Sequence, residues 1–403
     1  MNIILLKLAF RNLFYYPKNT FILLFSVIFG VSLGLLGVSI INGLVIQRQI
    51  EKMDTSLAHL KINHLDYQND KQSIFYINQT ENIIKKIKKE IDIQAITKRI
   101  NIRGLILNGT QNLAVDIYGV DILNEKKVLQ LSTYIRKGVY LSEKDKPQIV
   151  IGKALAQKLQ KKINDTLQIQ TTNIAQKNSI LKVKIVGIYE VGQEQFSKTH
   201  IFLPFDFLEQ YIFLEKKQDF SHQILIKIKK KEQANHIKKQ IKSLFVTQKI
   251  DLQISTWIEN APDLAYWYLI LDVFFFIFLG LIFFALGIAL FNLMAMSVWS
   301  RKEELYRLYV LGIAQKKVQL MIIFETILLL IVALPLSFLI CYGTIFYFQT
   351  YGLDVSLWNE AMSVWGYHSK IYPFLSVQYY FFTFFLAFLT ALLAGFLVSR
   401  NIF

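Results

Sequence analysis

The sequence predicts an α-helical membrane protein with four transmembrane helices and a large α+β extracytoplasmic domain inserted between the first and second of them. Three observations predict this fold class. The chain is strongly apolar, because 53% of its 403 residues are hydrophobic, 14% are aromatic and only 18% are charged. Four segments have the roughly 20 apolar residues that a helix needs to cross a bilayer. Between the first two segments lies a long polar region in which strand periodicity recurs.

The apolar segments divide the chain into nine parts. The first segment is longer than the core of a signal peptide and lacks a small-x-small cleavage site, so we expect an uncleaved anchor. The expected parts are a basic elbow (1–20), a first span (21–46), the extracytoplasmic domain (47–265), a second span (266–296), a cytoplasmic helical linker (297–317), a third span (318–347), an extracytoplasmic loop (348–376), a fourth span (377–398) and a cytoplasmic tail (399–403).

Lysine and arginine near the ends of the spans indicate the orientation. The first 20 residues carry three basic residues and no acidic one, and the linker 297–317 carries five basic residues against two acidic ones. The tail adds Arg400, whereas the loop 348–376 has a single basic residue, Lys370. We therefore expect both termini and the linker to be cytoplasmic, and the large domain to lie outside.

The formal charge of +16 comes from 45 basic and 29 acidic residues. A basic balance is typical of nucleic-acid binding, but many of these lysines fall in the expected external domain, in "KKIKKE" and "KIKKKEQANHIKKQIK". These runs fit the solvated faces of amphipathic helices. The alternative is attraction to anionic lipid headgroups. We expect no nucleic-acid partner.

The external domain combines strand and helix patterns. "SHQILIKIK", "KKEQANHIKKQIKSLF" and "KIDLQISTW" predict strand, helix and strand. Earlier, "AHLKINHLDY" predicts a strand and "TENIIKKIKKEID" predicts a helix with a threonine cap. Asn108–Gly109 is a turn dipeptide that should join two further strands. The stretch 142–211 differs in pattern, which indicates one subdomain inserted into another.

A catalytic or metal site is not indicated. The sequence has no GxxxxGK[ST] phosphate loop, no GxSxG elbow and no HExxH motif. Its single cysteine, Cys341, lies in the third span, so neither a disulfide nor a cysteine-rich metal site is possible within the chain. We expect no catalytic residue, no metal and no cofactor in this chain.

The linker has the pattern of a short amphipathic helix. Its apolar residues should fall on one side, and Gly312 should end the helix. The apolar residues are Leu305, Leu308, Tyr309 and Leu311. Such a helix could dock into a groove of a partner protein, or it could lie at the lipid interface, anchored by Trp299, Tyr306 and Tyr309.

Several stretches resemble the FtsX-like, MacB/LolE-type ABC transporter permeases. "RKEELYRLYVLGIAQKKVQLMIIFETILL" is similar to the cytoplasmic turn of that family, and "LKLAFRNLFYYPKNTFILLFSVIFGVSLG" is similar to its basic elbow and first span. "QIVIGKALAQKLQKKINDTLQIQ", "LKVKIVGIYEVG" and "HIFLPFDFLEQY" resemble its external domain, with Ile-Gly and Val-Gly-Ile landmarks. The chain departs from the family pattern at Tyr306, Tyr309, Ile313 and Pro335.

The resemblance implies a coupling helix that is gripped by a partner ATPase. The residues it assigns to that helix are Glu303, Glu304, Leu305, Leu308, Leu311 and Gly312. It also implies that two permease chains pair, as a homodimer or a heterodimer, with two ATPase subunits that bind ATP and Mg²⁺. Since only about 20 residues precede the first span, we expect that ATPase to be a separate protein.

Among these permeases the chain looks most like the lipoprotein-releasing LolC/LolE subunits. That likeness implies a multi-pass protein of the bacterial inner membrane that extracts lipoproteins and hands them to a periplasmic carrier. The stretch "TTNIAQKNSI", where a carrier-recruiting loop would protrude, is short. The alternatives are a MacB-like export permease for a peptide, toxin or amphiphile, and an FtsX-like regulator of a cell-wall hydrolase.

Two features inside the expected spans invite a hypothesis. Gly30 and Gly34 form a GxxxG pattern with Gly37 nearby, so this face could meet a dimer mate or line a cavity for acyl chains. Common occurrence of glycine in membrane helices would explain it equally well. Glu325 is costly in a membrane unless it is paired, and we expect a structural role close to Lys316 and Lys317.

Overall fold

The computed structural model describes residues 2–15, 17–68, 74–109, 111–142, 146–212, 219–245, 252–311, 313–358, 361–362, 367 and 370–400. These residues form two compact units, which are described separately below. The helical unit comprises Met1–Gln47, Trp267–Val355 and Lys370–Phe403. The α/β unit comprises Arg48–Tyr266 and Ser356–Ser369.

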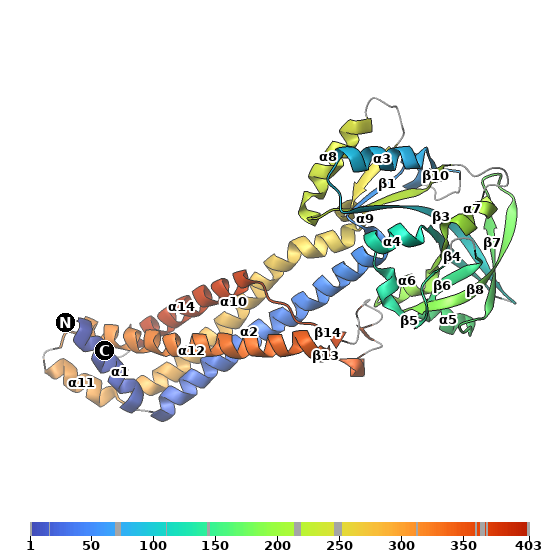
Figure 1. Ribbon diagram of the computed structural model, residues 1–403. Coiled ribbons are helices and arrows are strands. Elements are labelled where there is room, and N and C mark those ends of the chain that lie inside the picture. The colour runs from blue at the N-terminus through green and yellow to red at the C-terminus, as the bar shows by residue number, and fades with distance from the viewer. Residues whose placement is uncertain are drawn as a thin grey trace. The chain divides into compact units, whose positions relative to one another are not determined.

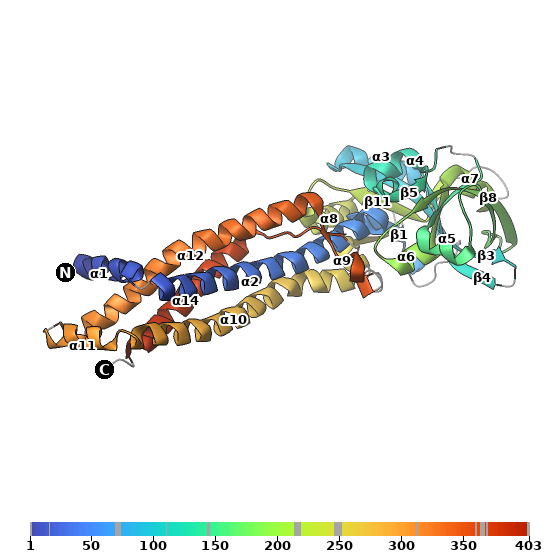
Figure 2. The same cartoon turned by 90° about the horizontal axis from the view of Figure 1, so that it is seen from below.

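The helical unit is built from long apolar helices (Figures 1 and 2). Its helices are α1 (Asn2–Tyr15), α2 (Pro17–Lys52), α10 (Pro262–Trp299), α11 (Lys302–Val310), α12 (Gln315–Tyr351) and α14 (Val377–Arg400). Four stretches are long and apolar enough to cross a membrane: Thr20–Leu57, Ile270–Trp299, Gln315–Tyr351 and Val377–Arg400. The prediction of four such helices is confirmed, and the helices extend beyond the ranges expected from hydropathy alone.

One apolar core holds these helices together. Leu35 on α2, Phe275 on α10, Ile322 on α12 and Ala391 on α14 are all buried in it. A small residue lets α14 approach α12 closely, because a Cβ atom added to Gly395 of α14 would lie 2.8 Å from Thr326 Oγ1 of α12. Helix α12 continues without interruption through Pro335. Backbone hydrogen bonds closed within each helix are what a bilayer requires of a spanning segment.

Residues 372–376 form an extended segment that crosses α2 within the helical unit, and we call this segment the strap. The strap follows β14 (Lys370–Ile371), which pairs with β13 (Leu353–Asp354) in a short antiparallel ladder. The Phe374 N–H donates to the Ser39 carbonyl at 2.9 Å. A Cβ atom at Gly43 would lie 2.3 Å from the Tyr372 carbonyl oxygen. The absence of a side chain at Gly43 therefore lets the strap's backbone lie directly on the helix.

The α/β unit contains a ten-stranded sheet in the order β12-β1-β11-β3-β4-β9-β6-β8-β5, with β7 pairing both β3 and β8. The strands are β1 (Leu60–His64), β3 (Ala95–Asn108), β4 (Gln111–Val120), β5 (Ile135–Gly138), β6 (Gln148–Gly152), β7 (Thr166–Thr172), β8 (Asn178–Tyr189), β9 (His200–Pro204), β11 (Gln223–Lys227) and β12 (Leu252–Thr256). Because β7 pairs with both β8 and β3, part of the sheet closes into a ring. The ring consists, in order, of β3, β4, β9, β6, β8 and β7. Closure removes the exposed sheet edges that such strands would otherwise have.

Helices cover the sheet over two separate cores. The first core lies between the strands β1, β11 and β12 and the helices α3 (Thr80–Glu90) and α8 (Ala234–Phe245). Both helices contribute isoleucines at helical spacing to it. The core of the ring lies under α5 (Lys153–Leu159) and α7 (Phe205–Ile212). The strand β3 takes part in both, since its first residues pair β11 and its last residues pair β7. The two expected subdomains therefore share one continuous sheet.

The start of α3 corrects one prediction. The expected threonine cap, Thr80, is the first helical residue, and the N-cap is Gln79, whose side chain makes no capping bond. The hydroxyl of Thr80 donates instead to the Ile77 carbonyl. The Glu81 N–H donates to both carboxylate oxygens of Asp219 at 3.0 Å. A residue distant in sequence therefore satisfies the helix terminus, and periodicity could not indicate it.

A buried ion pair joins the sheet to α4 (Ile122–Val128). Arg99 on β3 and Glu125 on α4 are each 1% exposed. Arg99 Nε donates to Glu125 Oε1 at 2.7 Å, and Nη2 contacts the same oxygen. The guanidinium also lies 5.3 Å from the centroid of the Tyr118 ring. Burial raises the pKa of Glu125, and the charge of Arg99 opposes that rise.

The landmark glycines of the α/β unit lie where two backbones approach each other. A Cβ atom at Gly152 would lie 2.1 Å from the Ser197 carbonyl oxygen, and one at Gly187 would lie 2.3 Å from the Val139 carbonyl oxygen. Gly187 pairs with Gly138 across β8 and β5. Gly138 has a φ of +76°, which disfavours any residue with a side chain. Close packing thus accounts for glycine at these positions.

Candidate functional site

The short helix α11 joins α10 to α12. Two glutamates, Glu303 and Glu304, occupy its first turn, where the helix dipole favours negative charge. Glu303 pairs with Arg307 one turn later at 3.6 Å, and both side chains are exposed. The helix ends at Val310, and the Leu311 N–H donates to the Arg307 carbonyl at 3.0 Å. The expected helix breaker, Gly312, lies outside the described residues.

The apolar residues of this segment point in two directions. Leu305 is 2% exposed and lies in the core of the helical unit, and Leu308 packs against that core. Tyr309 and Leu311 were expected on the same side, but they are 47% and 79% exposed. The exposed apolar side chains of this segment are Tyr306, Tyr309, Val310 and Leu311. We call these four side chains the outer face of α11.

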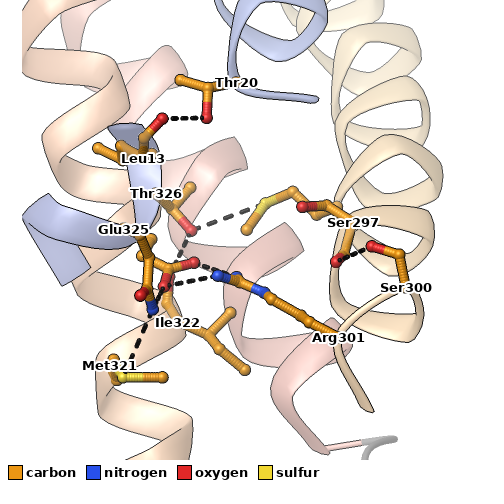
Figure 3. A network of polar contacts seen from close by, with 11 residues as sticks. Leu13, Thr20, Ser297, Ser300, Arg301, Met321, Ile322, Glu325 and Thr326 are labelled. Atoms are coloured by element: carbon orange, nitrogen blue, oxygen red, sulfur yellow. Dashed lines mark hydrogen bonds and ion pairs between the residues drawn. The ribbon is translucent and has the colours of Figure 1, made fainter. Parts of the chain in front are cut away.

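A buried polar network fixes the beginning of α11 (Figure 3). Arg301, directly before the helix, is 6% exposed, and Glu325 on α12 is also 6% exposed. Arg301 Nη1 donates to Glu325 Oε1 at 3.0 Å, and Arg301 Nη2 contacts Oε2. Asn12 on α1 donates from Nδ2 to Glu325 Oε1 at 2.8 Å. Three separate elements therefore meet at one carboxylate, and we call Asn12, Arg301 and Glu325 the polar clamp.

The clamp lies in a mostly apolar pocket of the helical unit. Its neighbours include Val27, Met294, Leu330 and Ala391. Thr326, next to Glu325, donates back to the Ile322 carbonyl at 2.9 Å, as Figure 3 shows. In such surroundings two charges are stable only when they are paired and hydrogen-bonded.

Sequence reasoning found the acid of the clamp but missed its partners. Lys316 and Lys317 are nearer in the sequence, yet Glu325 forms an ion pair with Arg301. One sequence signal could have indicated Arg301, because it lies in the short connection between the second and third spans, on the side where the third span begins. Asn12 is 313 positions from Glu325, and no local pattern points to it.

The glycines of the first span lie against another helix of the same chain. A Cβ atom at Gly30 would lie 2.7 Å from Leu286 Cδ1, and one at Gly34 would lie 3.4 Å from Ile282 Cγ2. At Gly37 the nearest atom is Phe278 Cε1 at 3.9 Å. All three neighbours belong to α10, so α2 uses these small residues to approach α10.

Replacing Gly30 by leucine is expected to destabilise the helical unit by about 1–3 kcal/mol, because the added side chain overlaps Leu286. Thermal unfolding of the purified chain in detergent measures the effect. The matched control is Gly280→Leu on α10, where a Cβ atom would meet no heavy atom within 4 Å. Equal melting temperatures for the two variants would contradict the α2–α10 contact.

Within the described ranges, no group of three or more histidine, cysteine, aspartate or glutamate side chains could hold a metal ion. Cys341 is buried.

Comparison with known proteins gives one family match. Residues 20–244 match the model of the MacB-like periplasmic core domain, which is more than half of the chain. No curated protein matches the sequence.

Solved structures of low similarity were also found. The periplasmic region of MacB from Actinobacillus actinomycetemcomitans has 14% identity and a TM-score of 0.36, covering 52% of this chain and 94% of that one. The extracellular domain of the noncanonic ABC-type transporter YknZ from Gram-positive bacteria has 12% identity and a TM-score of 0.35, covering 49% and 99%. A domain of a putative permease from Porphyromonas gingivalis has 11% identity and a TM-score of 0.28, covering 49% and 88%.

Proposed function

This chain belongs to the family of the MacB-like periplasmic core domain, and from that premise we propose that it is the permease subunit of an ATP-driven ABC transporter. The four apolar helices and the α/β unit support a membrane protein with an extracytoplasmic domain. The basic residues of the elbow, the linker and the tail support cytoplasmic termini. As the membrane we propose the bacterial inner membrane, which the resemblance to the permease family implies. The α/β unit then lies between the first and second spans, on the periplasmic side.

The observation that carries the proposal is the division of α11 into an anchored and an outer face. Leu305 secures the helix to the core, whereas Tyr309 and Leu311 project away from it. Aromatic and leucine side chains that are exposed together on a short helix and at its C-cap fit a groove of a partner protein. We propose that the partner is a cytoplasmic ATPase dimer that binds ATP and Mg²⁺, and that α11 passes its movement into the membrane.

The mechanism in this proposal transmits force and needs no chemistry in this chain. Nucleotide binding moves the ATPase subunits, and α11 moves with them. A second permease chain, identical or related, completes the assembly. The extracytoplasmic domains then change position and release the substrate, which is mechanotransmission rather than passage through a continuous pore.

For the substrate we propose acylated lipoproteins, transferred to a periplasmic carrier. The support is the combination of a chain of 403 residues, four apolar helices and a large external domain, in which the chain looks most like the LolC/LolE subunits. The turn between β7 and β8, where a carrier-recruiting loop would protrude, comprises only residues 173–177, so carrier binding would use another surface of the chain.

Export of a peptide, toxin or amphiphile is the second candidate, because the matched family model is MacB-like. Regulation of a cell-wall hydrolase is the third candidate.

Purification of the complex from native membranes, followed by intact-mass identification, separates these candidates. Recovery of an ATPase with triacylated lipoproteins supports lipoprotein release. Recovery of an ATPase with a cell-wall hydrolase supports the regulator, and an ATPase with a peptide or amphiphile supports export. Absence of any ATPase would overturn the proposed role of α11.

Replacing Leu311 by aspartate is expected to reduce the co-purified ATPase at least tenfold, because a charge would enter an apolar contact. Quantitative mass spectrometry of the purified complex measures the ratio of ATPase to permease. The matched control is Leu357→Asp, at a leucine that is 96% exposed in the α/β unit. Equal ATPase recovery in the two variants would exclude the outer face as the docking surface.

A further inference from the structure

We propose that the polar clamp of Asn12, Arg301 and Glu325 transmits the displacement of α11 to α1 and α12. This inference rests on the proposed function, because it assumes that an ATPase moves α11. The inference adds to the proposed function a specific set of contacts. In it, the three side chains of the clamp transmit the movement of α11, in addition to the covalent connections of the chain. Without such a clamp, only the covalent connections and the packing of Leu305 and Leu308 would couple α11 to the spanning helices.

The position of Arg301 makes it the pivot point of α11. It lies between the last residue of α10, Trp299, and the first residue of α11, Lys302. Its carbonyl accepts the Leu305 N–H at 3.2 Å, so it belongs to the backbone of the first helical turn. Its side chain leaves that turn and ends on Glu325 of α12. A rotation of α11 therefore pulls directly on α12.

The clamp extends this connection to the amino-terminal helix. Asn12 donates to the same Glu325 oxygen that accepts from Arg301 Nη1. The junction that follows α1 is itself tied, because Thr20 Oγ1 donates to the Leu13 carbonyl at 2.8 Å (Figure 3). Movement at Glu325 can thus reach the start of α2 through α1.

Burial makes the clamp a stiff connection. The pocket around it offers mostly apolar side chains, including Leu290, Leu329 and Leu330. Separating Arg301 from Glu325 there would leave each charge without compensation in surroundings of low polarity. An exposed pair such as Glu303 with Arg307 separates easily, because water replaces its partner. The elements joined by the clamp therefore move together rather than apart.

The test uses Glu325→Gln in the complete complex with its co-purified ATPase. This change keeps the shape of the side chain and removes its charge, while the outer face of α11 is untouched. Hydrogen exchange is measured in α1, α11 and α12 with and without a non-hydrolysable ATP analogue and Mg²⁺. We expect ATPase recovery within twofold of the wild type. The nucleotide-dependent change in exchange should persist in α11 and fall at least threefold in α1 and α12.

Three further variants make the result specific. Asn12→Leu should weaken the response of α1 more than that of α12. The charge exchange Arg301→Glu with Glu325→Arg should restore at least half of the α12 response. Glu194→Gln, which removes an exposed acid paired with Lys198 in the α/β unit, should leave the response unchanged. A melting temperature for each variant shows that the chain is folded.

The outcomes separate this inference from the proposed function. If the wild-type complex contains no ATPase, the proposed function fails. If Glu325→Gln retains the full response of α12, or if it releases the ATPase, the clamp does not transmit motion and this inference fails alone. Both Glu325→Gln and the charge exchange can fold and yet show no nucleotide-dependent change in the hydrogen exchange of α12. In that case the ion pair is not the contact that transmits the motion.

Discussion

Replacing Arg99 by methionine is expected to destabilise the α/β unit by about 3–5 kcal/mol, the usual cost of leaving one member of a buried ion pair alone. Glu125 would then lose the donor at 2.7 Å and the buried cation that is bonded to it. Hydrogen exchange of the β3 backbone amides in the full chain measures the loss, as a hundredfold or greater fall in protection.

The pH dependence of this variant distinguishes an unpaired charge from a packing defect. Burial already raises the pKa of Glu125, and removing Arg99 raises it further. Between the unfolded and folded pKa values the folded state binds more protons, so its stability increases as the pH falls. We therefore expect the deficit of the Arg99→Met variant to shrink when the pH is lowered from 7 towards 5. A deficit independent of pH would contradict the assignment.

The double variant Arg99→Met with Glu125→Leu is the control for this pair. Replacing both charges by apolar side chains of similar volume removes the unpaired carboxylate, and such replacements are often neutral or stabilising. We expect the double variant to recover most of the protection lost in the single variant. If it is as unstable as the single variant, the site depends on shape rather than on charge pairing.

The sequence predicted the features that arise from local patterns. Four apolar runs gave four long helices, because length and hydropathy are properties of a continuous segment. Alternation in "QILIK" and "LQIST" gave β11 and β12. Asn108–Gly109 marks the turn between β3 and β4, where Gly109 has a φ of +61°.

The sequence could not predict contacts that depend on tertiary packing. The sequence indicates that Glu325 needs a partner, but Arg301 and Asn12 come from other elements. Leu311 was assigned to the same side as Leu305, because helical spacing was extended past Val310. The helix ends there, so periodicity no longer determines the direction of the side chain. Closure of the ring by β7 likewise depends on pairings between distant strands.

Replacing Gly152 by alanine is expected to destabilise the α/β unit by about 3 kcal/mol, near the upper end for overpacking. The added Cβ atom would lie 2.1 Å from the Ser197 carbonyl oxygen and 2.6 Å from Ser197 Cα. A flexible side chain could turn away, but here backbone atoms of α6 (Glu194–Thr199) must move. That shift would break the bond from the Tyr189 hydroxyl to the Phe196 carbonyl. Hydrogen exchange of β6 and β8 measures the effect.

Two comparisons decide whether backbone approach is the cause of this loss. Gly109→Asn places a side chain where no heavy atom lies within 4 Å, and asparagine tolerates a positive φ, so we expect a cost below about 1 kcal/mol. Adding Ser197→Ala to Gly152→Ala removes the hydroxyl that would lie 2.4 Å from the new Cβ atom but leaves the carbonyl in place. We expect this second change to restore little stability, because the closest contact is with the backbone. Full recovery would instead assign the strain to the serine hydroxyl, and glycine at this position would then reflect one neighbouring side chain rather than the approach of β6 to α6.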